Sequence, residues 1–523
     1  MARYEVIIVG GGPVGMGLAI ELGQRGISVA VVEKYKKPQP IPKGQNLTQR
    51  TMEHMQSWGV EEKLRSARTI PASYGIGGLT AYGSLLSGWH YDWLQRDLVA
   101  QYYATGNERL PQYKTEEVLR SRVTELETVN VFYGYTVDVV SQTVQETQVI
   151  AHNKAGEELS LTADYAVGCD GANSLLRNQS AMVQTCREHD RKMVLLVFRS
   201  RELHELLAAF PGKSYYNVLE PELKGYWRFL GRVDLGETWF YHAPVDADLD
   251  EDADFAAMLH QTVGAEFKVV LEHVGFWDLR FAIADNYQDK RLFIAGDAAH
   301  SHPPYGGYGV NSGLEDVRNL GWKLAACLRG WGGDELLASY SEERAAVFHS
   351  TSEDFIEASI KNDGDFLASY SPEKNLEAFE AEWTARSSGA VDEVNKFEPN
   401  YEGSPIISGS KNAKPSAIGS HMFEARAGHH LAPYRLPDGG NLFDRLGTGF
   451  TLFDFSGKGM SALFVTQAAK RGMPLNVIVE TSEVASHYKS KLLLVRPDNF
   501  VSWVGNKLPD NVDGVLKTAI GCN

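Results

Sequence analysis

The chain has 523 residues, of which 43% are hydrophobic, and its formal net charge at pH 7 is −16. A chain of this length exceeds what one hydrophobic core supports, so we expect several domains. Nucleic acids and anionic membrane surfaces attract basic proteins, and this acidic chain is therefore not expected to bind either of them.

The four cysteines, Cys169, Cys186, Cys327 and Cys522, form no CxxC pair and lack the spacing of metal ligands. We therefore expect reduced thiols, no metal site and a cytoplasmic location. The N-terminus enters a predicted strand at once, which leaves no room for a signal peptide. No apolar run approaches the ~20 residues that span a bilayer.

The N-terminal segment predicts a strand, a glycine-rich turn, a helix and a second strand. An apolar run over residues 4–9 enters the sequence GGGPVG at residues 10–15, and another over residues 27–32 ends at Glu33. This βαβ fingerprint binds a dinucleotide, with the pyrophosphate at the helix N-terminus and the acid on a ribose. An acid here disfavours a 2′-phosphate, so we expect tightly bound FAD or NAD rather than NADP.

The next segments are read from their composition and spacing. Residues 38–50 form a loop in which Lys43 and Arg50 either approach the pyrophosphate or are solvated charges. Residues 69–96 predict hairpin strands of an inserted sheet, and residues 110–126 predict a helix with one apolar face.

Aromatic, β-prone runs separated by turn residues predict an antiparallel sheet as a second layer. These runs are residues 194–199, 215–219, 226–232 and 239–242. Their large aromatic side chains either wall an apolar pocket or are ordinary sheet packing; they are Tyr216, Trp227, Trp239 and Tyr241.

The central motif lies at residues 291–324. A predicted strand ends at Gly296-Asp297, which places a carboxylate at the edge where open α/β sheets bind ligands. The loop at residues 303–309 contains two prolines and three glycines, so it is stiff and allows close approach of a flat ligand. A helix that begins near Val310 and Asn311 directs its positive end to the same cleft. These features together suggest a flavin.

The rest of the chain predicts helices to about residue 376 and a polar linker from residue 386 to residue 410. A small α/β unit follows, with a predicted order of strand, helix and three further strands over residues 450–504. This order fits a thioredoxin-like layout. Because no CxxC is present, we expect this unit to be structural.

Three motifs occur in order along the chain. They are GGGPVG with Glu33, Asp170-Gly171 followed by Ser174 and Arg177, and Gly296-Asp297 followed by Pro303-Pro304 and Asn311. Together they resemble the single-component FAD-dependent aromatic hydroxylases, the family of para-hydroxybenzoate hydroxylase and phenol hydroxylase. The C-terminal extension is most similar to the phenol hydroxylase branch, whose thioredoxin-like tail lacks redox cysteines.

The resemblance implies an α/β fold with three parts. A Rossmann-like FAD-binding domain comprises residues 1–75, 97–185 and 280–345, and an antiparallel-sheet substrate domain comprises residues 76–96 and 186–279. A helical segment and linker over residues 346–405 leads to a thioredoxin-like domain without CxxC at residues 406–523.

The resemblance also implies site residues. The expected FAD-binding residues are Gly10, Gly12, Pro13, Val14, Gly15, Glu33, Lys43, Arg50, Gln112, Asp170, Asp297, Pro304, Gly307, Gly309, Val310 and Asn311. Lys43 stands where the family usually has arginine, and Gln45 falls close to the position of the catalytic aspartate in phenol hydroxylase. The candidate catalytic residues are Gln45, Tyr216, Arg228, His242 and Tyr305. His300 and His302 are expected to form structural hydrogen bonds.

The implied activity is hydroxylation of a small phenolic or other aromatic substrate through a flavin C4a-hydroperoxide, with FAD, transient NADPH or NADH, and O₂. The implied assembly is a homodimer. A Baeyer–Villiger or other oxidative tailoring reaction is the alternative on the same scaffold. A non-catalytic flavoprotein that uses its tail for interactions is the alternative from another class.

Overall fold

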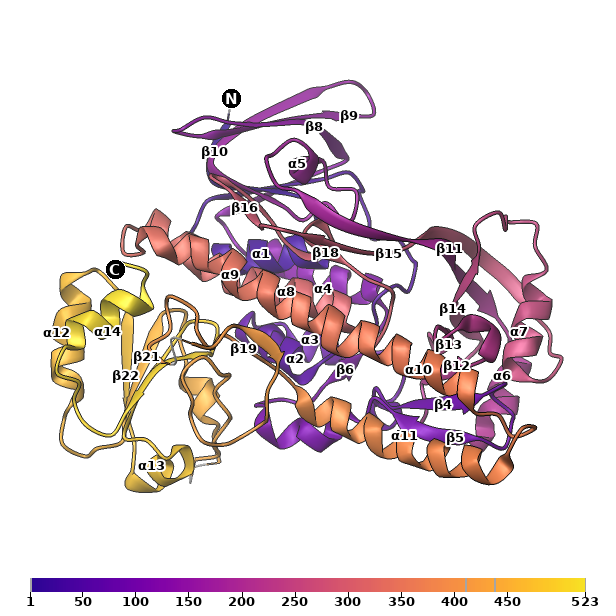
Figure 1. Cartoon of the computed structure of the whole chain (residues 1–523). Helices are drawn as coiled ribbons and strands as arrows, with labels where there is room; N and C mark the ends of the chain where they lie inside the picture. The colour runs from indigo at the N-terminus through magenta and orange to yellow at the C-terminus, as the bar shows by residue number, and fades with distance from the viewer. Residues whose placement is uncertain (1, 410–411, 437–438, 523) are drawn as a thin grey trace.

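The computed structural model describes residues 2–409, 412–436 and 439–522. Figure 1 shows a first sheet near the N-terminus and a C-terminal unit beside this first part of the chain. Two long strands, β11 (Gln184–Arg199) and β15 (Val270–Ala284), lead from the first part to a second sheet at their far end. Helix α8 (Tyr308–Leu328) and helix α9 (Asp334–Ser350) cross the middle of the molecule. In the described parts of the chain, no helix is both long and apolar enough to cross a membrane.

The first sheet has a parallel core in the order β17-β10-β1-β2-β7. Its strands are β1 (Ala2–Val9), β2 (Val29–Glu33), β7 (Val129–Tyr133), β10 (Glu158–Gly168) and β17 (Leu292–Ile294). The strands β8 (Tyr135–Gln142), β9 (Thr147–Asn153) and β16 (Gln288–Asp289) extend it with antiparallel pairings. Because parallel strands end at one edge, the segments that follow β1, β2, β10 and β17 meet there.

Helices cover this sheet, and their apolar residues share one core with its strands. They include α1 (Pro13–Gly23), α2 (Gln49–Ser57), α3 (Glu61–Ser66), α4 (Gln112–Val123) and α5 (Leu175–Asn178). Two short strands, β3 (Asn46–Leu47) and β6 (Glu108–Arg109), pair with each other beside α8. This part of the chain is the predicted Rossmann-like unit.

The second sheet has the order β18-β15-β11-β14-β13-β12-β4-β5. Its strands are β4 (Gly78–Tyr82), β5 (His90–Trp93), β11 (Gln184–Arg199), β12 (Tyr215–Leu219), β13 (Trp227–Arg232), β14 (Thr238–Asp246), β15 (Val270–Ala284) and β18 (His300–Ser301). All pairings are antiparallel except β12 with β4, which run parallel. The predicted sheet is therefore mixed at one pairing, where the hairpin β4–β5 joins it.

The two faces of the second sheet have different covers. One face packs against α6 (Arg201–Leu206) and α7 (Phe255–Val263). The other face packs against the loop at residues 303–309 and the helices α10 (Ala358–Ser369) and α11 (Leu376–Lys396). We call the face under α6 and α7 the helix-covered face. We call the other face the flavin-side face, after the FAD position that the sequence leads us to expect. Since side chains alternate along a strand, each strand residue belongs to one face only.

The segment between the second sheet and the C-terminal unit is more helical than the sequence predicts. A π-helical turn, η6 (Thr351–Glu357), connects α9 to α10, and α11 continues to Lys396 instead of giving way to a linker at residue 386. Phe379 and Trp383 of α11 are buried against Tyr82 of the sheet, which explains why this polar-looking stretch is ordered as a helix.

The C-terminal unit contains a four-stranded sheet in the order β22-β21-β23-β24. Its elements are β21 (Phe450–Asp454), α12 (Ser461–Lys470), β22 (Leu475–Val479), α13 (Ser482–Tyr488), β23 (Leu492–Val495), β24 (Val501–Gly505) and α14 (Val512–Ala519). β21 and β22 are parallel and the other pairs antiparallel, and α13 adds a helix between β22 and β23 that the expected order of one helix and four strands did not contain. The thioredoxin-like assignment of this unit stays a prediction. All four cysteines are free thiols.

The remaining elements are short. They are η1 (Ala72–Tyr74), η2 (Arg96–Tyr102), η3 (Leu207–Ala209), η4 (Pro221–Leu223), η5 (Gly296–Ala298), β19 (Phe397–Asn400), β20 (Ser416–Ile418) and η7 (Leu442–Arg445).

A buried ionic cluster joins the C-terminal unit to α8 and α9. The Glu343 carboxylate accepts hydrogen bonds from the Arg496 guanidinium at 2.6 and 2.9 Å and from the Lys323 ammonium at 2.8 Å. All three side chains are fully buried. Burial alone raises the pKa of Glu343, but the charges of Arg496 and Lys323 outweigh it and hold that pKa well below its usual range.

We expect the substitution Glu343→Gln to lower the free energy of unfolding by about 3–5 kcal/mol, because it leaves the buried Lys323 without an anion and removes one of the two carboxylates that pair with Arg496, which keeps only Asp498. The measurement is chemical denaturation followed by tryptophan fluorescence. The control is Lys361→Ala, which removes an exposed ion pair with Asp365 and should change stability by less than about 1 kcal/mol. Equal effects of the two substitutions would contradict the proposed importance of the cluster.

Candidate functional site

The first and third sequence motifs meet at the side chain of Val14, at the start of α1, while the second motif meets the first at Gly10, where a Cβ atom would lie 3.0 Å from Asp170 Cα. A Cβ atom at Gly296 would lie 3.0 Å from Val14 Cγ2, and one at Gly313 would lie 2.7 Å from the same atom. The turn η5 and the N-terminal part of α8 therefore pack directly on the start of α1. These glycines bring three ligand-binding elements to one edge of the sheet.

The glycines in the turn after β1 have different structural roles. Gly10 has φ of 101°, and a Cβ there would lie 2.3 Å from the Cys169 carbonyl oxygen. A Cβ at Gly15 would lie 2.0 Å from the Gly10 oxygen. At Gly12, by contrast, no atom lies within 4 Å of such a Cβ, and no side chain caps the helix that follows. The open space therefore faces the uncapped helix N-terminus, which fits an anionic pyrophosphate.

Glu33 lies at the end of β2 and is buried. Its carboxylate accepts hydrogen bonds from the backbone N–H of Gly11 at 2.6 Å and from that of Tyr35 at 2.7 Å. Glu33 thus fixes the glycine-rich turn. A carboxylate has about four acceptor positions, so the two bonds leave capacity for ribose hydroxyls.

Two further carboxylates stand at this edge. The Asp170 Oδ2 atom caps α5 through the N–H groups of Leu175 and Leu176, while its Oδ1 is buried without a partner. Asp297 is exposed to solvent and forms no hydrogen bond with the described residues. Surrounding protein atoms nevertheless raise the pKa of the Asp297 carboxyl, and the charge of Lys43 opposes this shift. Both residues therefore retain unused acceptors that suit ligand hydroxyls.

The segment at residues 43–51 is held against α8. The Gln112 Oε1 accepts from the Gly44 N–H at 3.1 Å, and a Cβ at Gly44 would lie 3.1 Å from Val310. The Asn311 amide accepts from the Thr48 N–H and donates to two backbone carbonyls, so its side chain is fully occupied. What α8 offers a ligand is therefore its first-turn N–H groups, which begin after Gly307.

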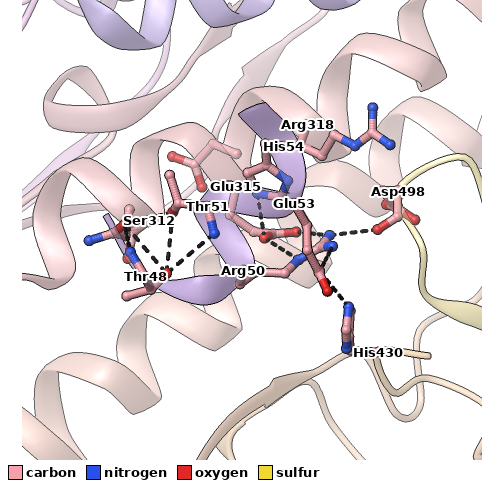
Figure 2. A network of polar contacts seen from close by, with 12 residues as sticks. Thr48, Arg50, Thr51, Glu53, His54, Ser312, Glu315, Arg318, His430 and Asp498 are labelled. Carbon is pink, nitrogen blue, oxygen red and sulfur yellow. Dashed lines mark hydrogen bonds and ion pairs between the residues drawn. The ribbon is translucent and has the colours of Figure 1, made fainter. Parts of the chain in front are cut away.

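The structure corrects the expected role of Arg50. Its guanidinium pairs with Glu315 at 2.9 and 3.0 Å and with Glu53 at 3.1 Å, and it donates to the Asp498 carbonyl. Figure 2 shows this network, in which His430 of the C-terminal unit also reaches Glu53. Arg50 thus joins α2 to α8 and to the C-terminal unit, and its donors are not free for a pyrophosphate.

The predicted catalytic residues lie on different faces of the second sheet. Tyr216 and Arg228 are on the helix-covered face, where Tyr216 donates to the Lys213 carbonyl and Arg228 pairs with Glu220. The alternation of strand side chains directs both residues away from the flavin-side face, so we withdraw them as catalytic candidates. Trp239 and Tyr241 share the helix-covered face, and only Trp227 of the four expected pocket aromatics faces the other side.

Tyr305 and His242 lie on the flavin-side face. The Tyr305 ring contacts Trp93 and Trp227, and its hydroxyl donates to Glu393 of α11 at 3.3 Å. Tyr308 donates to the same carboxylate at 3.1 Å. These bonds anchor to α11 the loop that contains Pro304 and the first turn of α8 that contains Gly309.

His242 is buried among the rings of Phe229, Phe240 and Trp277, and its Nδ1 has no hydrogen-bond partner. Burial lowers the pKa of His242 to about 3. The imidazole is therefore neutral near pH 7 and can act as a hydrogen-bonding group but not as a standing cation.

Gln45 is buried, and its amide oxygen accepts from the Arg109 guanidinium at 3.0 Å. No role was predicted from the sequence for Arg109, Glu393 or Asp316. Asp316 accepts from the Gly296 N–H and from His300, and so fixes the turn that carries Asp297. His300 forms the structural hydrogen bond that was predicted, and the described residues contain no cluster able to hold a metal.

We expect the stability of the protein to depend on His242 in acid. The unfolded chain takes up a proton near pH 6.5 and the folded His242 only near pH 3, so stability is complete above about pH 6.5 and falls toward pH 3. One such group contributes at most ~1.4 kcal/mol per pH unit. Denaturation at several pH values should show a smaller slope between pH 4 and 6.5 for His242→Phe; an unchanged slope would contradict this assignment.

Comparisons with known proteins agree with this geometry. The chain is 29% identical to 4-methyl-5-nitrocatechol 5-monooxygenase from a Burkholderia species, over 99% of this chain and 97% of that protein. It is 33% identical to an uncharacterized aromatic compound monooxygenase, YhjG, of Bacillus subtilis (strain 168), over 66% of each. The structure of chromopyrrolic acid-soaked RebC with bound 7-carboxy-K252c has 27% identity and a TM-score of 0.84, over 100% of both chains.

The FAD binding domain family matches residues 3–354, which is more than half of the chain. The resemblance predicted from the three motifs is thereby confirmed. The protein belongs to the FAD binding domain family, and its relatives in that family are flavin-dependent monooxygenases of aromatic and polyketide compounds.

Proposed function

We propose that this protein is an NAD(P)H-consuming, FAD-dependent monooxygenase that hydroxylates a phenolic or other aromatic substrate. The observation that carries the proposal is the meeting of the three motifs around the start of α1, where Gly296 and Gly313 pack on Val14 and Gly10 packs on Cys169 and Asp170. Family membership supports the cofactor, and the names of the relatives support an aromatic substrate.

The residues of this chain fit FAD at distinct points. The open space at Gly12 and the uncapped start of α1 suit the pyrophosphate, while Glu33 and Asp297 supply acceptors for ribose or ribityl hydroxyls. Lys43 lies close enough to Asp297 to affect its pKa and adds a positive charge near this edge. When bound, FAD would supply hydride acceptance from NADPH or NADH and activation of O₂ at its C4a position.

The protein contributes an electrostatic and a steric environment. The first-turn N–H groups of α8 and the helix dipole stabilise negative charge at the adjacent ring edge. The packed aromatic residues of the flavin-side face, among them Trp93, Trp227 and Phe229, exclude water from the reaction. Tyr305, Gln45 and the neutral His242 are the polar groups that remain as candidates to orient a substrate hydroxyl.

The test is anaerobic reduction of the FAD-loaded protein by NADPH and by NADH, with and without a panel of phenols. We expect at least tenfold faster reduction with one phenol and a product heavier by one oxygen that carries a new ring hydroxyl. Reduction that no phenol accelerates, together with a lactone or ester product, would replace hydroxylation by a Baeyer–Villiger reaction. Failure of either nucleotide to reduce the flavin would contradict a catalytic role.

Gly12 and Gly10, both in the turn after β1, give a matched test of the FAD site. Gly12→Ala should leave the stability of the FAD-free protein unchanged, because its Cβ enters open space, but should weaken FAD binding by at least about tenfold, or ~1.4 kcal/mol. Gly10→Ala should instead destabilise the FAD-free protein by about 1–3 kcal/mol, because φ is positive and the Cys169 carbonyl is close. Thermal unfolding and FAD titration measure both effects; normal FAD affinity in Gly12→Ala would contradict the placement of the pyrophosphate.

A further inference from the structure

Arg109, at the end of β6, carries a buried charge that the protein itself does not satisfy. The residue is only 3% exposed. Its Nη2 donates to the Gln45 amide oxygen at 3.0 Å and to the Arg232 carbonyl oxygen. Its Nε and Nη1 are buried without a hydrogen-bond partner. A guanidinium is always charged and has only donors, so such a group calls for an acceptor from outside the chain.

No carboxylate neutralises this guanidinium among the residues that the structure describes. The neighbouring Glu108 turns its carboxylate to Arg65 and Arg68 and to the backbone N–H of Arg109. Burial lowers the pKa of Arg109; the nearby Tyr215 hydroxyl opposes this shift, and the positive charge of Arg232 adds to it. Arg232 is 2% exposed and also has no carboxylate partner within the described parts of the chain, so positive charge is in excess around Arg109.

Two other buried donors surround Arg109. The Tyr215 ring lies 4.5 Å from the guanidinium carbon, and its hydroxyl forms no hydrogen bond of acceptable geometry. The Gln45 amide nitrogen has only a long contact, 3.4 Å, with the Pro42 carbonyl oxygen. The residues that converge here thus present donors in excess of acceptors, which is the composition of an anion site.

Arg109, Tyr215 and Gln45 lie next to the aromatic residues of the flavin-side face. Tyr215 stacks on Phe229 with ring centroids 5.4 Å apart, and Phe229 leads to His242 along the flavin-side face. Gln45 follows Gly44, which contacts Val310 and Gln112 at the expected FAD segment. An aromatic ring that lies along this face can therefore direct a substituent to Arg109.

We propose that Arg109, with Tyr215 and Gln45, forms the subsite for an anionic oxygen substituent of the aromatic substrate. A carboxylate and a phenolate share this chemistry, since each presents a charged oxygen to a guanidinium. The inference rests on the proposed function and narrows its substrate class to aromatic acids or ionised phenols. Arg109 recognises the substituent and has no part in the transfer of oxygen.

The experiment uses the FAD-loaded protein and measures Kd from the perturbation of the flavin absorbance. One probe pair is 4-hydroxybenzoate and 4-hydroxybenzamide, which differ in a carboxylate. The other pair is 4-nitrophenol, ionised at mildly alkaline pH, and its methyl ether. We expect the wild-type protein to bind the anion of one pair at least tenfold more tightly than its neutral partner. The pair that shows the preference identifies the carboxylate or the phenolate as the recognised group.

The variant Arg109→Met should reduce this preference to about one. Arg109→Lys keeps the charge but loses the planar donors, and it should show an intermediate preference and serve if the methionine variant does not fold. Arg68→Met is the matched control, because Arg68 is 26% exposed and lies on the other side of Glu108, and it should keep the wild-type preference.

Several outcomes would overturn the proposal. One is a wild-type protein that binds FAD and is reduced by NAD(P)H but prefers the anion in neither pair. Another is an Arg109→Met protein with normal FAD content and a wild-type preference. Loss of FAD from both Arg109 variants would assign the residue to the cofactor instead. A wild-type protein that takes up no FAD would refute the proposed function itself, which separates the two failures.

Discussion

The candidate site depends on one close packing contact, the insertion of Val14 between Gly296 and Gly313. The contact requires two positions without side chains, because a Cβ at either glycine would lie within 3.0 Å of the valine. It sets the distance between the start of α1, the turn that carries Asp297 and the first turns of α8. A larger residue at either glycine would push the start of α1 away from the Gly296 turn and from α8.

Helix α8 transmits this constraint to the rest of the molecule. Its N-terminal end faces the groove, whereas its middle carries the buried charges Glu315, Asp316, Arg318 and Lys323. Asp316 holds the Gly296 turn and Arg344 of α9 at the same time. Arg318 pairs with Glu21 of α1 and donates to the Pro497 carbonyl of the C-terminal unit. Because buried charges are tolerated only when fully paired, these contacts fix the position of the C-terminal unit relative to the groove.

The parts that the sequence predicted are those in which local spacing determines geometry. A parallel strand followed by a glycine-rich turn and a helix places its side chains at the sheet edge whatever the rest of the chain does, so the position of Gly12, Glu33 and Asp297 at this edge was predictable, while their role in FAD binding stays a prediction. The structure also shows Gln112 and Val310 meeting at Gly44, as their expected common role requires.

The parts that were missed depend on distant partners. Arg50 has the composition of a loop cation, and only the position of Glu315, 265 residues later, makes it an internal ion pair. Strand alternation separates Tyr216 from Tyr215, but the sequence does not tell which face α6 and α7 will cover. Likewise α11 has few apolar residues, and its order depends on the contacts of Phe379 and Trp383 with the sheet.

The satisfaction of polar groups distinguishes the two faces of the second sheet. On the helix-covered face most polar side-chain atoms have partners: Trp239 donates to the Ser200 carbonyl, Tyr241 bonds to Thr262, and Arg228 pairs with one oxygen of Glu220, whose other oxygen has none. On the flavin-side face comparable atoms are buried without partners, and they are Tyr215 Oη, Asn217 Oδ1, Trp227 Nε1 and His242 Nδ1. A buried polar atom without a partner destabilises the folded protein, and a row of them along one face is best explained by a ligand that completes their hydrogen bonds. These unpaired atoms support the proposal that the flavin-side face binds the substrate, and this support is independent of the FAD motifs.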